Sequence, residues 1–221
     1  MDAVRLLSGT PKLAPGQVSL TFDDGPGPRT VELTELLAER DVPATFFLLG
    51  ESIERYGHLL GTYRATGQAI GLHGERHRPF SSVARALDQL ARCRARLPGH
   101  LTEPVWFRPP YGIADLAVPG YAGPVGWHAH GSDWDVTYRR GQTVAGCVDA
   151  IVGALTRSDG GIVLLHDYAP ASEFTAAGLT EAELDLRITE ITELLIGRLR
   201  ADGFDLTGLP EPVGTRSENP G

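Results

Sequence analysis

Two histidines and a pair of neighbouring aspartates are the residues of this sequence best suited to hold a metal ion. His73 and His77 are four residues apart, and Asp23 and Asp24 follow an alternating stretch that ends at residue 22. Imidazoles at positions i and i+4 can face one ion if the turn between them is helical. One carboxylate completes a three-ligand set that leaves a coordination position open for water. The spacing therefore predicts a catalytic metal site rather than a structural one.

The histidine pair is weak evidence by itself, because the chain contains seven histidines. The run HGERH at residues 73–77 is also not the H-E-x-x-H helix of metalloproteases, since Glu75 comes one position too late. Neighbouring carboxylates repel each other when both are ionised, so burial of Asp23 beside Asp24 favours a nearby cation. The alternative is an Asx-type turn before Gly25-Pro26 that binds nothing.

Short apolar runs alternate with stretches of helical periodicity along the chain. Strands are expected at residues 17–22, 44–49, 68–72, 105–107, 124–128, 161–165 and 204–206. Helices are expected at residues 29–40, 51–66, 81–97, 143–156 and 181–202. This order is typical of an α/β protein with a mostly parallel sheet, here closed as a barrel. Barrels carry their chemistry at the carboxyl ends of the strands, so the polar residues that end these strands are expected to meet there.

Length and charge narrow the range of functions. The 221 residues fit one domain, and the net charge of −8 disfavours a nucleic-acid partner. The first residues contain no long apolar run, which predicts no membrane span and no secretion signal, and hence a cytoplasmic location unless a leader was removed. Cys93 and Cys147 are expected to be buried, reduced thiols. The sequence indicates no particular oligomeric state.

Five short motifs follow one another in the sequence: TFDDGP at residues 21–26, HGERH at 73–77, RPPYG at 108–112, SDW at 132–134 and LLH at 164–166. In this order they resemble the motifs of the polysaccharide deacetylase family, which is carbohydrate esterase family 4 or the NodB homology domain. The resemblance extends from about Gln17 to Leu206 and implies a single-domain distorted (β/α)7 barrel. The domain is expected to span residues 17–207, between an N-terminal lead-in at 1–16 and a flexible tail at 208–221.

The resemblance implies a role for each matching residue. Asp24, His73 and His77 match the metal ligands of the family. Asp23 matches the catalytic base, and Arg108 matches the arginine that holds this base in position.

The remaining matches concern the general acid and the substrate. His166 matches the general acid, and Asp133 matches the carboxylate that orients it. The residues matched to substrate binding are Tyr111, through its backbone N–H at the oxyanion, Trp134 and Leu164, as the apolar wall around the acetyl methyl group, and Pro110.

The resemblance implies a metal-dependent hydrolase that removes an N-acetyl group from an N-acetylated sugar or sugar-containing small molecule. Acetate and a free amine would result. Imidazole and carboxylate ligands suit Zn²⁺ first, and Co²⁺, Ni²⁺, Mn²⁺ and Fe²⁺ also fit. Two alternatives stay open: hydrolysis of another amide or of a cyclic imide or ureide, and a non-catalytic carbohydrate-binding relative.

The chain departs from the family pattern at two positions. Gly74 stands where the family usually has Ser or Thr, and His130 stands where it often has Asp, three residues before Asp133. His128 and His130 are expected to serve in packing rather than in substrate contact, although either could reach the substrate.

Overall fold

A parallel sheet forms the centre of the fold in the computed structural model, which describes residues 4–139 and 141–211. The strand order is β3-β2-β1-β5-β4, and β6 pairs with β1. All the pairings are parallel. The strands are β1 Gln17–Asp23, β2 Ala44–Leu49, β3 Ala69–Gly74, β4 Ala129–His130, β5 Gly161–His166 and β6 Asp205–Leu206.

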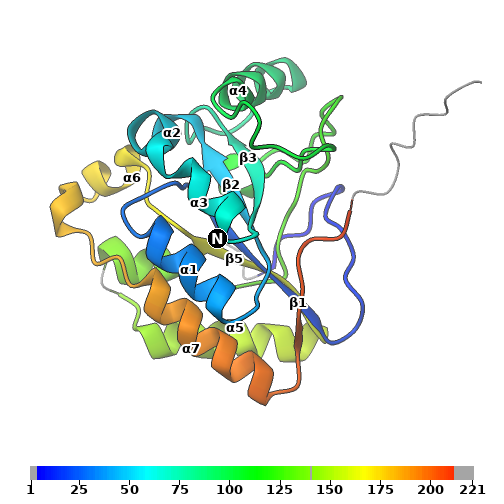
Figure 1. Ribbon diagram of the computed structural model, residues 1–221, viewed down its shortest axis with the longest axis vertical. Helices are drawn as coiled ribbons and strands as arrows, with labels where there is room; N and C mark the ends of the chain where they lie inside the picture. The colour runs from blue at the N-terminus through cyan, green and yellow to red at the C-terminus, as the bar shows by residue number, and fades with distance from the viewer. Residues whose placement is uncertain (1–3, 140, 212–221) are drawn as a thin grey trace, which may run out of the picture.

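Helices follow most of the strands and cover the sheet (Figure 1). The α-helices are α1 Thr30–Glu39, α2 Gly50–Tyr56, α3 Leu60–Ala65, α4 Val83–Ala95, α5 Val144–Ser158, α6 Ala171–Ala176 and α7 Ile188–Ala201. Shorter helical turns are η1 Gly57–Leu59, η2 Pro110–Gly112, η3 Asp135–Arg139 and η4 Glu181–Glu183. Helix α7 contacts both α1 and α5, whereas α4 packs on β3. Among the described helices, none has both the length and the hydropathy required to cross a bilayer.

Isolated bridges continue the sheet beyond β3, toward the segment that leads into β4. Phe107 bridges to Leu72 of β3, and Trp106 bridges to Ala122, both in parallel. The chain then leads from Ala122 to β4, which pairs with β5. The predicted α/β class and distorted barrel are therefore confirmed. The stretches predicted as strands at 105–107 and 124–128 form only such bridges and loop hydrogen bonds. In the second stretch, Trp127 pairs with Arg5 of the N-terminal segment.

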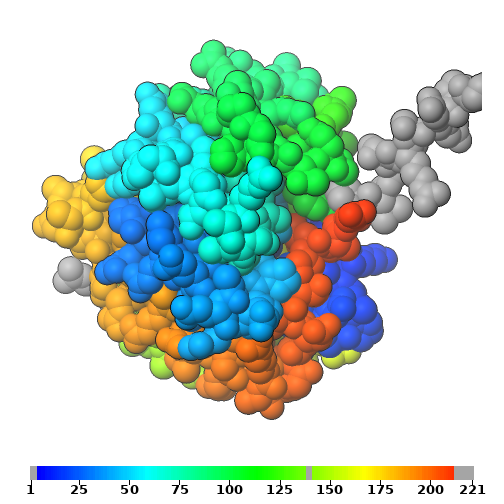
Figure 2. Space-filling view, viewed as in Figure 1, coloured from blue at the N-terminus to red at the C-terminus, as the bar shows by residue number. Residues whose placement is uncertain are grey.

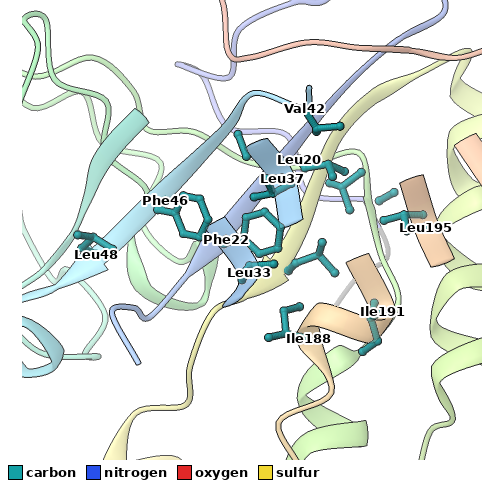
Figure 3. Packing of buried hydrophobic residues seen from close by; sticks show 14 of the residues in the cluster. Leu20, Phe22, Leu33, Leu37, Val42, Phe46, Leu48, Ile188, Ile191 and Leu195 are labelled. Atoms are coloured by element: carbon teal, nitrogen blue, oxygen red, sulfur yellow. The ribbon is translucent and has the colours of Figure 1, made fainter. Parts of the chain in front are cut away.

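Alternation along β1 separates the outer core from the barrel interior. Leu20 and Phe22 pack with α1 and α7 in the main apolar cluster, as Figure 3 shows. The alternate residues Thr21 and Asp23 point to the opposite face of the strand, into the barrel, where both accept hydrogen bonds from Arg108. Because side chains alternate with a period of two, the same strand fills the core and delivers polar groups inside the barrel.

Aromatic rings pack together where β1 and β2 meet α3. The ring of Phe46 is fully buried and stacks on Phe22, with 4.8 Å between ring centroids. The ring of Tyr63, on α3, also packs against Phe46, with 4.9 Å between ring centroids. Every residue of β2 is buried, as its continuous apolar sequence predicts.

Two predicted helices are divided in the structure. The stretch predicted at 51–66 consists of α2, η1 and α3. The prediction of one helix at 181–202 was wrong at its start, because η4 ends at Glu183 and α7 begins only at Ile188. Thr180 and Glu183 form a capping box, and Leu184 is extended (φ −71°, ψ 128°), so that it packs against a small cluster around Phe174. Tertiary packing therefore overrides the helical pattern of the acidic run.

The two ends of the described chain lie side by side, as the adjacent dark blue and red surfaces of Figure 2 show. The backbone N–H of Asp205 donates to the carbonyl of Gly16. Leu13 and Leu209 both pack against the cluster of Phe47 and its neighbours at the base of the barrel. Most of the tail predicted at 208–221 lies outside the described residues. Cys93 and Cys147 are buried and unpaired, as expected.

We expect Phe46→Ala to lower the free energy of unfolding by about 3–5 kcal/mol, because it removes a fully buried ring between two aromatic neighbours. Chemical unfolding at 25 °C measures the change. Val31→Ala, on the exposed side of α1, is the control and should change this energy by no more than about 0.5 kcal/mol. Equal losses in both variants would contradict the packing described here.

Candidate active site

A cavity of about 210 Å³ opens at the carboxyl ends of β1, β3 and β5. Asp23, Asp24, His73, His77 and His166 all line it. The strands thus bring together residues that are up to 143 positions apart, at the end of the sheet where barrel proteins place their chemistry.

Asp24, His73 and His77 form the one group of possible metal ligands found among the described residues, with ligand atoms within 4.8 Å of one another. A carboxylate oxygen of Asp24, Oδ1, lies 3.5 Å from Nε2 of His73 and 3.7 Å from Nε2 of His77. Ligand atoms about 2.0–2.2 Å from one tetrahedral ion lie about 3.3–3.6 Å apart. This same oxygen is buried and has no hydrogen-bond partner among the described residues. The three residues therefore fit a divalent metal ion.

His73 is held in the form that a metal ligand requires. Its Nδ1 lies 2.8 Å from the carbonyl oxygen of Arg108, which can only accept a hydrogen bond. The proton must therefore sit on Nδ1, and the lone pair of Nε2 faces Asp24. Burial lowers the pKa of His73 to about 3, which keeps the ring neutral.

A strained turn separates the tasks of the two neighbouring carboxylates. Asp24 has a φ of 71°, in the left-handed region that residues other than glycine adopt at an energetic cost. The hydroxyl of Ser52 donates to its carbonyl, at 2.6 Å. At Gly25 a Cβ atom would lie 2.2 Å from a carboxylate oxygen of Asp167, so only glycine fits. The turn directs Asp23 into the barrel and Asp24 toward the histidines.

Asp23 is paired with a fully buried arginine. Nη1 of Arg108 donates to Oδ1 of Asp23 at 2.7 Å, and Nη2 donates to the hydroxyl of Thr21 at 2.9 Å. The guanidinium also lies over the ring of Phe47, 4.4 Å from its centroid. Burial alone would raise the pKa of Asp23, but the charge of Arg108 lowers it below its ordinary value. Asp23 is therefore an ionised carboxylate, and its Oδ2 lies 3.6 Å from Nε2 of His73.

Asp24 has no such partner. Burial raises the pKa of Asp24 to about 6 in the protein without an ion, although the nearby His77 opposes this. A divalent cation would favour the ionised form of this carboxylate.

His166 lines the same cavity and is oriented by Asp133. The backbone N–H of His166 donates to Oδ2 of Asp133 at 2.7 Å, and Nδ1 of the ring lies 3.1 Å from Oδ1. Burial alone would lower the pKa of His166, but the negative charges of Asp133, Asp24 and Asp23 raise it to about 9. The imidazole is therefore protonated at neutral pH, and its ring packs edge-on against Trp134 at 5.3 Å.

Three of the four residues matched to substrate binding line the cavity, namely Tyr111, Trp134 and Leu164. Pro110 is buried within η2 and is not a lining residue. Leu164 faces inward on β5 between Ile162 and His166, by the same alternation as on β1. Tyr111 has a φ of 60°, so a second strained residue stands at this site.

One of the two departures from the family pattern, Gly74, has a structural explanation. Gly74 has a φ of 99°, which side-chain-bearing residues rarely adopt, and a Cβ there would lie 3.2 Å from the ring of Phe80. His128 accepts a hydrogen bond from the N–H of Ile162, near the start of β5 and away from the cavity. His130 packs against Trp134, with 5.0 Å between ring centroids. Neither histidine is a lining residue of the cavity.

Sequence reasoning missed several cavity residues, including Trp127, Thr137, Tyr168 and Glu173. Tyr168 and Glu173 lie in the segment that follows β5, and Glu173 contacts both Tyr111 and His77. The one available signal was their position just beyond the carboxyl end of a barrel strand. That signal does not say which of the residues turns inward.

The fold is a parallel α/β barrel, and its cavity is lined by two imidazoles, two carboxylates and a third, oriented histidine. These features are those of a barrel protein with a candidate catalytic metal centre. The polysaccharide deacetylase family profile matches residues 11–128. The chain belongs to this family.

Individual relatives agree with this assignment. A chitooligosaccharide deacetylase of Sinorhizobium fredii is 32% identical over 225 residues, which cover 96% of this chain and 98% of that protein. A peptidoglycan-N-acetylglucosamine deacetylase of Bacillus cereus is 29% identical and covers 80% of this chain and 87% of its own. The fold is similar to a family 4 acetyl xylan esterase from Clostridium thermocellum in complex with a cobalt ion (TM-score 0.65, 23% identity, coverage 87% and 88%).

We expect Zn²⁺ to stabilise the metal-free protein against unfolding through these three ligands. Free ion at about a hundred times its Kd should add about 2.7 kcal/mol to the free energy of unfolding. His73→Ala should lose this increment, whereas His58→Ala, which removes an exposed imidazole outside the cavity, should keep it. Chemical unfolding with and without the ion measures both. An undiminished increment in His73→Ala would place the ion elsewhere.

Proposed function

We propose that this chain is a metal-dependent N-deacetylase that hydrolyses the acetamide of an N-acetylated amino sugar to acetate and a free amine. The names of the relatives point to N-acetylglucosamine units in chitooligosaccharides or peptidoglycan as the class of substrate. Zn²⁺ is the first candidate for the ion, and the cobalt-bound esterase supports Co²⁺ as a substitute.

The presence of Asp23 and His166 side by side in one cavity carries this proposal. The two residues are register partners on the neighbouring strands β1 and β5, and each has its own charged partner. Arg108 favours the ionised carboxylate, and Asp133 favours the protonated imidazole, so the pKa values of the two groups are pushed in opposite directions. Groups separated in this way can serve as base and acid at the same pH.

The chemistry follows from these protonation states. An ion held by Asp24, His73 and His77 would act as a Lewis acid toward water and the amide carbonyl. Asp23 takes a proton from the attacking water as the new C–O bond forms. The backbone N–H of Tyr111 donates to the oxyanion.

Collapse of the tetrahedral species breaks the C–N bond. Nε2 of His166 gives its proton to the departing nitrogen, because an amide ion is a very poor leaving group. Trp134 and Leu164 offer an apolar wall of the size needed beside the acetyl methyl.

We expect Asp23→Asn to lower kcat by about 10²–10⁴-fold while the metal stays bound. Asparagine keeps the size of the side chain and an oxygen that accepts from Arg108, but it cannot take the proton of water. Acetate release from chitooligosaccharides measures the rate, before and after chelation and metal re-addition. Asp88→Asn, on the exposed side of α4, is the matched control and should keep full activity. Full activity in Asp23→Asn would overturn the assignment of the base.

The pH profile tests the general acid separately. Activity should fall as the pH rises through the pKa of His166, because the deprotonated ring cannot donate. Asp133→Asn removes the charge that raises this pKa, so the alkaline limb of kcat should move down by about one pH unit or more, toward the ordinary value near 6.5. Asp149→Asn on α5 should leave the profile unchanged. An alkaline limb that stays in place would exclude His166 as the acid.

Substrate panels separate the alternatives. N-acetylhexosamines and chitooligosaccharides should release acetate, whereas hydrolysis confined to cyclic imides or ureides would assign the site to ring amides. Sugar binding without acetate release at any metal loading would indicate a non-catalytic relative.

A further inference from the structure

Glu173 reaches the candidate metal site from outside the five motif segments. It belongs to α6, in the stretch between β5 and α7. Its Oε1 accepts a hydrogen bond from the hydroxyl of Tyr111 at 2.5 Å. The same oxygen lies 3.5 Å from Nδ1 of His77. The rings of Tyr111 and His77 pack at 4.2 Å, so the three side chains form one compact cluster at the cavity wall.

The two histidine ligands are oriented in different ways. Nδ1 of His73 donates to a main-chain carbonyl, that of Arg108, at 2.8 Å. Nδ1 of His77 is buried and makes no hydrogen bond of normal geometry among the described residues, while the carboxylate of Glu173 faces it. If Nε2 of His77 binds an ion beside Asp24, the ring proton must lie on Nδ1, on the side of Glu173.

We propose that Glu173 is a positioning residue for the metal site. Its carboxylate accepts a hydrogen bond from Nδ1–H of His77 and so directs Nε2 of that ring toward the ion. The inference rests on the proposed metal-dependent function. A carboxylate behind a ligand histidine sets its tautomer and increases its basicity. The hydroxyl of Tyr111 holds the carboxylate in place, so the side chain of Tyr111 serves the metal site as well.

The segment that carries Glu173 is anchored independently of the metal site. Phe174, the next residue, is buried in a cluster with Tyr168 and Ala169. Glu181 accepts hydrogen bonds from the hydroxyls of Tyr56 and Tyr168 and pairs with Arg55 of α2. Because these contacts fix α6 against α2, the carboxylate is presented to His77 from a rigid support.

Metal binding by the Glu173 variants tests the proposal directly. Apoprotein is titrated with Co²⁺ and Zn²⁺ against a chromophoric chelator, and the visible spectrum of the Co²⁺ form reports the ligand geometry. We expect Glu173→Ala to bind one ion about 10–100-fold more weakly, with a changed Co²⁺ spectrum. Glu173→Gln should lose less, since its amide oxygen can still accept from Nδ1, and it guards against misfolding because its size is unchanged. Glu190→Ala, an exposed glutamate of α7, should bind like the wild type.

The outcomes separate this inference from the proposed function. A wild-type protein that binds no ion would overturn both. Wild-type affinity and an unchanged spectrum in Glu173→Ala would overturn the positioning role alone. Retained metal with a raised KM and lost turnover would also overturn it, and would assign Glu173 to the substrate instead.

Discussion

Two neighbouring carboxylates are buried at the end of β1, and the charges that balance them organise the rest of the site. The charge of Asp23 is balanced by Arg108. This arginine is itself buried, and its other nitrogens donate hydrogen bonds to Thr21 and to backbone carbonyls. Asp24 has no guanidinium partner, and one of its oxygens is without a hydrogen bond in the described structure. An unpaired buried carboxylate is costly, and a divalent cation removes that cost. One strand end thus carries both the proposed base and a proposed metal ligand.

Strand register makes these charges meet. Asp23 lies opposite His166 across β1 and β5. The irregular pairing of β2 with β3 near Leu49 and Gly74 falls beside the candidate ligand His73. A slip of one residue in β1 would turn Asp23 into the apolar layer of Phe22. The outer core therefore does more than stabilise the protein, since burial of alternate residues in β1 fixes which side chains face the cavity.

Much of this site could be predicted from the sequence, because two of the three candidate ligands stand at or next to the end of a largely apolar strand. The end of β1 predicts Asp24, and the end of β3 predicts His73. The segment between β5 and α7 could not be predicted in this way. Its helices are six and three residues long, and its path depends on the packing of Phe174 and Leu184, which leaves no periodic signal. The inward position of Glu173 is a consequence of that packing, so local sequence rules do not reach it.

The central claim is that Asp24, His73 and His77 hold a single ion. Anomalous diffraction from crystals grown with Zn²⁺, measured on both sides of the zinc edge, tests it most directly. One peak should lie about 2.0–2.2 Å from an oxygen of Asp24 and from Nε2 of each histidine. A cavity without a peak at full zinc loading, or a peak bound by other side chains, would contradict the account.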